Sequence, residues 1–188
     1  MKDALEEEGF QAVRFVNHMA CDLSEPIVIP PMPVGLEVRP VPETHYWAAA
    51  QAIDEAFQDH WGHAPLTQEG FQHWIADPQF NPDLWQVAWD GGEIAAGIFN
   101  RVDEDANKQY NVQRGWTEPI FTRRPWRRRG LARALLMRSL RMLKDLGMTE
   151  AALVVDTQNP LGALGVYESC GFRMEYRSAI YEKGVWGW

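Results

Sequence analysis

An arginine-rich segment with small residues at fixed spacing is the part of this chain best suited to chemistry. Three consecutive arginines precede Gly130, Ala132 lies two residues later, and an amphipathic pattern predicts a helix from Gly130 to Leu146. The first turn of a helix has N–H groups without intrahelical acceptors and carries partial positive charge. Small residues let an anion approach that backbone, and arginines add charge and forked donors. The segment therefore predicts binding of a ligand that contains a diphosphate.

The spacing within this segment indicates which diphosphate ligand to expect. Neither GxGxxG, typical of dinucleotide sites, nor GxxxxGK[ST], typical of nucleotide triphosphate sites, is present. The pattern Arg127-x-x-Gly130-x-Ala132 instead resembles the R/Q-x-x-G-x-G/A signature of the GCN5-related N-acetyltransferases (GNAT), which bind the pyrophosphate of acetyl-coenzyme A.

The elements after this helix strengthen the resemblance. They are an apolar strand at 151–156, a turn that contains Asn159 and Pro160, a short helix that includes Tyr167, and Gly171-Phe172. These features occur in the same order in the second half of GNAT domains, although Asn159 and Tyr167 are one residue further apart than is most common. The resemblance covers about residues 35–183 and is most specific from Gly115 onward. It implies an α/β fold of the mixed α+β kind, with a mixed, mostly antiparallel central sheet and helices on both faces.

The resemblance also implies where acetyl-coenzyme A binds. The cofactor is expected to lie against the end of a strand at 116–123, where backbone groups of Phe121 and Thr122 pair with its amides and supply an oxyanion donor. Asn159 is expected to contact the pantetheine arm and to cap the short helix. The full set of expected cofactor contacts is Ile120, Phe121, Thr122, Arg127, Arg128, Arg129, Gly130, Leu131, Ala132 and Asn159.

Acylation of an amine requires a base for the ammonium and a proton donor for the departing thiolate. Glu118, a carboxylate entering the central strand beside Trp116, is the candidate base, directly or through water. It could equally be a strand-end carboxylate in a salt bridge. The resemblance implies that Tyr167 is the general acid, and the alternative is a half-buried aromatic whose hydroxyl reaches water.

A short polar loop is the candidate acceptor site. Asp59, His60 and Trp61 lie between the first two helices predicted within 36–188, which border the acceptor pocket in the family. A carboxylate and aromatic rings could contact a cationic amine. The same residues could instead anchor the loop, with Trp61 in the core and Asp59 as a turn residue.

Charge and composition limit the class of protein. The net charge of −8 divides into −14 through Glu118 and +6 after it, which favours a cationic acceptor in the first part and an anionic cofactor in the second. Since the arginines gather on one loop, we expect no nucleic-acid partner. No apolar run reaches the ~18 residues of a membrane span, so we expect a cytoplasmic protein without a membrane partner. Cys21 and Cys170 are predicted to be free thiols, and no metal is expected.

The N-terminal residues resemble the end of an acetyltransferase domain. Leu5 to Phe10, together with the polar and apolar mixture of residues after Phe10, is similar to the segment that runs from Tyr167 through Phe172 into the C-terminal strand. This similarity predicts that 1–28 are a remnant of a preceding GNAT-like domain. A proline-rich linker at 29–35 and a GNAT domain at 36–188 would come next, as in the C-terminal half of tandem acetyltransferases of the mycothiol synthase type. The strand near 13–21 would have an unpaired edge, which could pair with its own sheet or with a second copy in a homodimer.

Local patterns predict the other elements. We expect a strand at 36–41, helices at 45–58 and from Thr67 to 76, a hairpin of 84–89 with 93–102, and a polar loop at 103–113. The predicted function is transfer of an acetyl group from acetyl-coenzyme A to the primary amine of a small, cationic acceptor, by direct attack in a ternary complex. The alternatives are a non-catalytic acyl-coenzyme A-binding module for regulation or assembly, and a nucleic-acid binder.

Overall fold

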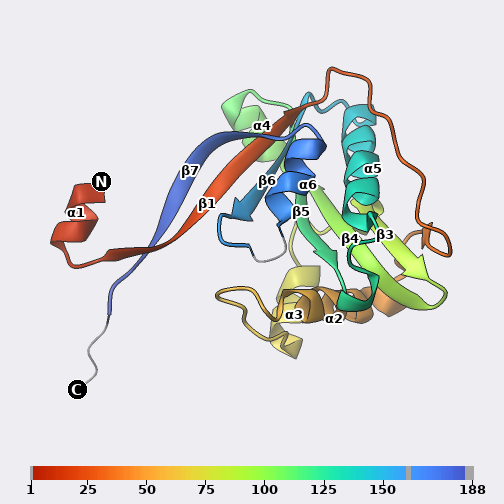
Figure 1. Ribbon diagram of the computed structural model, residues 1–188, viewed down its shortest axis with the longest axis horizontal. Coiled ribbons are helices and arrows are strands. Elements are labelled where there is room, and N and C mark those ends of the chain that lie inside the picture. Colours follow the sequence, from red (N-terminus) through yellow and green to blue (C-terminus); the bar gives the residue numbers. More distant parts are fainter. Residues whose placement is uncertain (1, 160–161, 185–188) are drawn as a thin grey trace.

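The computed structural model describes residues 2–159 and 162–184 and contains a seven-stranded sheet in the order β2-β3-β4-β5-β6-β1-β7 (Figure 1). All neighbouring strands are antiparallel except β5 and β6, so the sheet is mixed and mostly antiparallel, as predicted. The strands are β1 (Gln11–Asp22), β2 (Glu37–Val38), β3 (Trp85–Asp90), β4 (Glu93–Val102), β5 (Arg114–Thr122), β6 (Glu150–Asp156) and β7 (Arg173–Glu182). The α-helices are α1 (Lys2–Glu7), α2 (Tyr46–Phe57), α3 (Gln68–Ile75), α4 (Glu104–Tyr110), α5 (Leu131–Asp145) and α6 (Ala163–Ser169).

The two faces of the sheet have separate hydrophobic cores. Side chains alternate across a strand, so Ala88 packs on one face while Val87 and Trp89 pack on the other. On the first face the leucines of α5 and the rings of Tyr167 and Phe172 cover β1, β4 and β6. On the second face the alanines of α2 cover the aromatic side chains of β3, β4 and β5. Helices therefore lie on both faces, as the fold prediction required.

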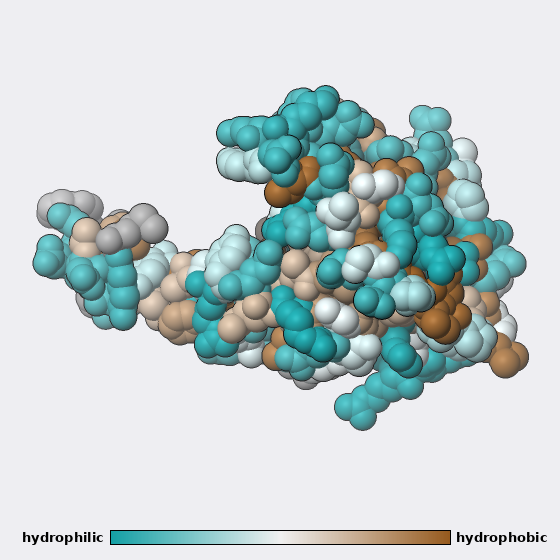
Figure 2. All heavy atoms as spheres, turned by 90° about the horizontal axis from the view of Figure 1, so that it is seen from above, coloured by the Kyte–Doolittle hydropathy of each residue, from teal (hydrophilic) through white to brown (hydrophobic). Residues whose placement is uncertain are grey.

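The N-terminal strand β1 lies inside the sheet. It pairs with β6 from Val16 to Asp22 and with β7 from Gln11 to Ala20, so its predicted unpaired edge is closed by its own sheet. Beyond the end of β6, β1 and β7 continue as a two-stranded ribbon with α1 near its tip (Figure 1), and this ribbon forms the projecting arm in Figure 2. Residues 11–22 thus belong to the sheet, and the descent of 1–28 from a preceding domain stays a prediction.

The segment after β1 runs along α5. Arg141 donates to the carbonyl of Ile27, Lys144 donates to the carbonyls of Ser24 and Glu25, and Arg129 donates to that of Val34. The proline-rich stretch at 29–35 contains no helix or strand. It therefore connects β1 to β2 along the surface of α5.

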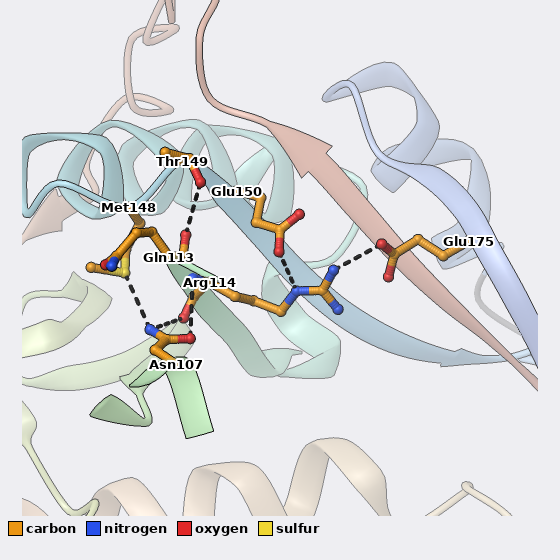
Figure 3. A network of polar contacts seen from close by, with 7 residues as sticks. All are labelled: Asn107, Gln113, Arg114, Met148, Thr149, Glu150 and Glu175. Atoms are coloured by element: carbon orange, nitrogen blue, oxygen red, sulfur yellow. Dashed lines mark hydrogen bonds and ion pairs between the residues drawn. The ribbon is translucent and has the colours of Figure 1, made fainter. Parts of the chain in front are cut away.

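A polar network joins four elements at one end of β5 (Figure 3). Arg114 on β5 donates to Glu150 on β6 at 2.7 Å and to Glu175 on β7 at 2.8 Å. Asn107 on α4 binds the backbone of Arg114 in both directions, through its Nδ2 and Oδ1 atoms. This network holds β5 and β6 together at the end where they pair.

Most predicted elements are present, and two differ from their predictions. The hairpin, the helix after Thr67 and the helix after Gly130 lie within two residues of their expected bounds, and the Thr67 hydroxyl accepts from the Gly70 N–H. The expected loop at 103–113 instead contains α4, whose first turn is capped by the Asp103 carboxylate bound to the Ala106 N–H at 2.8 Å. The strand expected at 36–41 is reduced to two paired residues, because the prolines at 40 and 42 lack the N–H groups that a ladder needs.

Candidate active site

The site begins where β5 and β6 separate. Their parallel pairing extends only from Arg114 to Trp116. Beyond it, side chains occupy the backbone groups of β6: the Thr117 hydroxyl donates to the Ala152 carbonyl at 3.3 Å, and Glu118 Oε2 accepts from the Val154 N–H at 3.0 Å. A shift in the β4–β5 register also falls between Thr117 and Ile120. The strands therefore diverge. Residues 119–122 keep β4 on one side, but their other edge, which faces β6, has no partner strand among the described residues.

A cavity of about 300 Å³ opens beside this free edge. β5 and the loop after it form one wall, the end of α2 with His60 forms a second, and the first turn of α5, Asn159 and helix α6 form the rest. The described residues that line it are Ala56, Phe57, His60, Ile120, Phe121, Thr122, Trp126, Arg127, Arg128, Gly130, Leu131, Ala132, Arg133, Asn159, Ala163, Val166 and Tyr167. None of these is acidic.

The first turn of α5 presents an open anion site to the cavity. Gly130 is the N-cap with φ +82°, Arg128 has φ +61°, and no side chain caps this end of the helix. Three N–H groups of the first turn, at 131–133, belong to residues that line the cavity. The geometry is that of a helix N-terminus able to bind phosphate oxygens.

The three consecutive arginines have different environments. Arg127 lines the cavity, but its guanidinium donates to the carbonyls of Thr122 at 3.0 Å and Ala56 at 3.2 Å, so it braces the loop. Arg128 lines the cavity and is exposed. Arg129 points to the segment along α5, where it bonds the Val34 carbonyl, and is absent from the lining. Arg133, which the sequence analysis did not select, lines the cavity one helical step after Ala132.

The alternation of backbone groups along β5 decides which of them face the cavity. The Arg123 N–H donates to Ala95 on β4, whereas the Thr122 carbonyl accepts from Arg127 on the other side. Since N–H groups alternate sides along a strand, those of Ile120 and Thr122 point away from β4, and that of Phe121 points toward it. Thr122 therefore fits the backbone pairing expected with the cofactor, whereas the Phe121 backbone faces β4. The Phe121 ring remains in the cavity wall.

Tyr167 on α6 lines the cavity and is nearly buried, with 9% of its surface exposed. Burial raises the pKa of its phenol to about 12, and the nearby negative charge of Glu118 contributes in the same direction. The hydroxyl therefore keeps its proton throughout the neutral range.

Glu118 lies on β5 at the point of separation and is not part of the lining. Its Oε1 pairs with Arg101 Nη2 at 3.1 Å, while Oε2 accepts from the Val154 N–H on β6. The salt bridge considered as an alternative for this carboxylate is thus present. A quarter of its side chain, 28%, is still exposed, so water can reach it.

The three residues expected at the acceptor site lie in different environments, and only one of them lines the cavity. His60 lines the cavity, its ring is tilted against that of Phe57 with centroids 4.5 Å apart, and its pKa is lowered chiefly by burial. Asp59 pairs with Arg124 at 2.6 Å on the surface, which lowers the pKa of the carboxyl. Trp61, expected either at the acceptor or in the core, is 43% exposed and lies against Arg14 outside the cavity lining.

The loop before α6 differs from its prediction in one respect. Asn159 lines the cavity as expected, but the N-cap of α6 is Gly162, so Asn159 does not cap that helix. Pro160, the second residue of the predicted turn, lies outside the described residues. The lining residues that the sequence analysis missed are Ala56, Phe57, Trp126, Arg133, Ala163 and Val166. Most are small or apolar, and only their spacing on the ends of predicted helices could have indicated them.

The cysteines, the possible metal ligands and the helix lengths bear on three further expectations. Cys21 and Cys170 are both free and buried, as predicted, and burial raises the pKa of the Cys21 thiol to about 11. Within residues 2–159 and 162–184, no three His, Cys, Asp or Glu side chains gather as a metal site would require. Over the same residues, no helix combines the length and the apolar character needed to cross a membrane.

Comparison with known proteins agrees with this geometry. The family model described as Acetyltransferase (GNAT) family matches residues 46–172. Mycothiol acetyltransferases from Thermobifida fusca and Streptomyces scabiei are 30% and 32% identical to this chain over 168 and 154 residues, which is 86% and 80% of it. It covers 51% and 46% of those two proteins, so the chain spans about half the length of the curated relatives it matches. The crystal structure of a GCN5-related N-acetyltransferase from Sphaerobacter thermophilus superposes with a TM-score of 0.79 at 28% identity, over 96% of this chain and 54% of that one. The chain belongs to the GNAT acetyltransferase family.

Proposed function

We propose that this chain transfers an acetyl group from acetyl-coenzyme A to the primary amine of a small, cationic acceptor, by direct attack in a ternary complex. The observation that carries the proposal is the cavity itself. It brings together an uncapped helix N-terminus, the free backbone edge of β5 and the protonated phenol of Tyr167. These are the groups that an acyl-coenzyme A ligand and its thiolate product require.

The residues present fit the cofactor. The N–H groups at the start of α5 and the exposed guanidinium of Arg128 would hold the diphosphate. The backbone groups of Ile120 and Thr122 that face the cavity would pair with the pantetheine amides. One of these two N–H groups would also donate to the oxyanion of the tetrahedral intermediate. Asn159 lies on the opposite wall, where the arm would pass.

In the proposed reaction, Glu118 takes a proton from the acceptor ammonium through a water molecule. The amine nitrogen then bonds to the thioester carbon, and the carbon–sulfur bond breaks as the oxyanion collapses. Tyr167 donates a hydrogen bond to the departing thiolate. A phenol of pKa about 12 is a weaker acid than a thiol of ordinary pKa near 8.5, so Tyr167 stabilises the thiolate mainly through that hydrogen bond. The excess proton on the nitrogen is lost to water, because Glu118 already carries the proton of the ammonium.

The acceptor side of the cavity and the charge of the chain favour a cationic amine. The acidic balance of the chain through Glu118 favours a cation, although the described lining of the cavity itself has no carboxylate. His60 and Phe57 provide rings at the α2 side of the cavity, which suit an ammonium group. The names of the curated relatives make the amine precursor of mycothiol the first acceptor to test.

One observation favours the second candidate, a non-catalytic acyl-coenzyme A-binding module. Both oxygens of Glu118 already have partners in Arg101 and Val154, which is the arrangement of a structural carboxylate. Such a residue could hold β5 and β6 apart without taking part in proton transfer.

An acetyltransferase releases free coenzyme A when an amine is present, whereas a non-catalytic binding module does not. Release of free thiol from acetyl-coenzyme A should be measured with a panel of small amines for the wild type, Glu118→Gln and Tyr167→Phe. Glutamine keeps one oxygen acceptor for the Val154 N–H but removes the charge and the oxygen that accepts from Arg101, so a loss of roughly 10²–10⁴-fold in kcat with unchanged Tm and unchanged affinity for acetyl-coenzyme A would assign Glu118 as the base. Tyr167→Phe should lower kcat by about tenfold, the worth of one hydrogen bond to a charged group. Binding of acetyl-coenzyme A without thiol release on any amine would favour the non-catalytic module.

A further inference from the structure

The ribbon formed by β1 and β7 brings a charged residue of the N-terminal segment close to the site. Val16 on β1 is opposite Asp156, the last residue of β6, and two residues earlier Arg14 lies just beyond the end of that strand. The β1–β7 register shifts between Ala12 and Arg14, which leaves Val13 as an extra residue. Such bulges redirect the neighbouring side chain. The bulge therefore lies directly before Arg14, whose side chain it can turn toward the end of β6.

Arg14 contacts two loops that border the cavity. Its Nε donates to Asp156 Oδ2 at 2.9 Å, and its Nη1 donates to Gln158 Oε1 at 2.6 Å. Its guanidinium carbon lies 5.3 Å from the ring centroid of Trp61, within the range of a cation–π interaction. Only 17% of the Arg14 side chain is exposed, although it does not line the cavity. One partly buried cation therefore joins the loop before α6 to the loop after α2.

The backbone of β1 reinforces this contact. The Phe15 carbonyl accepts from both the N–H and the hydroxyl of Thr157, each at 3.0 Å. The loop that carries Asn159 is thereby attached to β1 at two consecutive residues. Its position depends on the N-terminal strand as well as on β6.

The acceptor loop, residues 58–66, has anchors at both ends that do not involve β1. Asp54 on α2 accepts from the Leu66 N–H at 2.8 Å and bonds the His63 ring at 2.9 Å. Near the start of the loop, Asp59 pairs with Arg124 on the surface. Trp61 lies between these anchors, next to His60 in the cavity wall, and Arg14 is the cation that contacts it.

We propose that Arg14 is a positioning residue for the acceptor side of the site: it holds the His60–Trp61 part of the acceptor loop against the loop before α6. The N-terminal strand thereby determines the shape of the wall that the amine meets. This inference rests on the proposed function, because it assigns the loop to the acceptor. Of the segments assigned to the cofactor, β5 and the start of α5 are not among the described hydrogen-bond, ion-pair and ring contacts of Arg14, which instead bonds Gln158 beside Asn159.

The test compares Arg14→Met with Arg177→Met. Methionine keeps an unbranched apolar stem beside Trp61 and removes the charge and donors. Arg177 on β7 makes a matched control, because its Nε donates to Asn17 on β1 at 2.9 Å and it is absent from the cavity lining. Arg14→Lys is the conservative variant, since lysine can pair with Asp156 but lacks the fork that also reaches Gln158.

Two readouts separate positioning from loss of stability. In steady-state kinetics, Arg14→Met should raise KM for the amine about tenfold, the worth of one charge-assisted hydrogen bond, with a much smaller change in KM for acetyl-coenzyme A. Arg14→Lys should recover part of that loss, and Arg177→Met should change neither constant. In hydrogen exchange of the free protein, residues 58–66 should exchange faster in Arg14→Met and not in Arg177→Met.

The outcomes distinguish this inference from the function on which it rests. Unchanged exchange in 58–66 together with an unchanged amine KM in an active Arg14→Met enzyme would overturn the role of Arg14 alone. An equal rise in both KM values would also overturn it, because the effect would then not be confined to the acceptor. A wild type that transfers no acetyl group to any amine would instead overturn the proposed function, and the exchange experiment would still test whether Arg14 holds the loop.

Discussion

Replacement of Gly130 by alanine should have two separate effects: a loss of stability from the backbone conformation of the cofactor loop, and a loss of affinity for acetyl-coenzyme A. Gly130 has φ +82°, and a Cβ atom built there would meet no heavy atom within 4 Å. The cost of Gly130→Ala in the free protein is therefore the left-handed conformation alone, about 1–2 kcal/mol. For a chain of 188 residues this corresponds to a fall in Tm of roughly 2–8 °C.

Gly91→Ala is the matched control. Gly91 has φ +55° in the β3–β4 turn, it also has no heavy atom within 4 Å of a built Cβ, and it does not line the cavity. Both variants should lose similar stability by differential scanning calorimetry. Only Gly130→Ala should lose affinity for acetyl-coenzyme A, because its methyl group keeps phosphate oxygens from the N–H groups of α5.

The magnitude of the affinity loss is set by those N–H groups. One or two hydrogen bonds to a charged phosphate are worth about 1.5–3 kcal/mol each, so we expect acetyl-coenzyme A to bind at least tenfold more weakly to Gly130→Ala. The rise in Tm that saturating ligand produces should shrink accordingly. Equal affinity in Gly130→Ala and Gly91→Ala would refute the assignment of the α5 N-terminus as the diphosphate site.

Three further predictions concern stability. In Gly97→Ala the new Cβ would lie 2.6 Å from the Phe121 ring, so the variant should lose about 1–3 kcal/mol in urea unfolding and shift the cavity wall; an unchanged midpoint would contradict this packing. Asp103→Ala should lower the urea midpoint at pH 7 by loss of the α4 cap. The bond from Ala106 holds the pKa of Asp103 below its ordinary value, so this contribution is present above pH ~4 and is lost as pH falls through the lower, folded value; a difference between the proteins that persists at low pH would contradict it. Burial lowers the pKa of His60, so the folded state binds its proton less readily than the unfolded chain and loses stability below pH ~6.5. His60→Asn should therefore show a smaller fall in Tm between pH 7 and pH 5 than the wild type, and equal falls would be evidence against this.

Features with local signals were predicted well. The cofactor loop, the hairpin around Gly91 and the helix capped by Thr67 depend on turn residues, caps and periodicity within a few positions of the chain. The order of strand, loop and helix around Gly130 placed ten of the residues expected for cofactor and catalysis in one cavity: Ile120, Phe121, Thr122, Arg127, Arg128, Gly130, Leu131, Ala132, Asn159 and Tyr167.

Features that depend on distant pairing were not predicted. The place of β1 between β6 and β7 joins residues more than 130 positions apart along most of its length, and no local pattern encodes it. The contact of Arg14 with Trp61 depends on that pairing and was missed for the same reason. Helix α4 was missed because its sequence, EDANKQY, lacks an apolar stripe, and only the Asp103 cap and Asn111 at φ +52° mark its ends.

The central claim is that the cavity beside β5 binds acetyl-coenzyme A. Calorimetric titration of the wild-type chain with acetyl-coenzyme A tests it most directly. We predict saturable binding of one molecule per chain, displaced by free coenzyme A, which carries the same diphosphate. Absence of saturable binding would contradict the claim, because the roles assigned to the α5 N-terminus, Thr122 and Tyr167 all depend on that ligand.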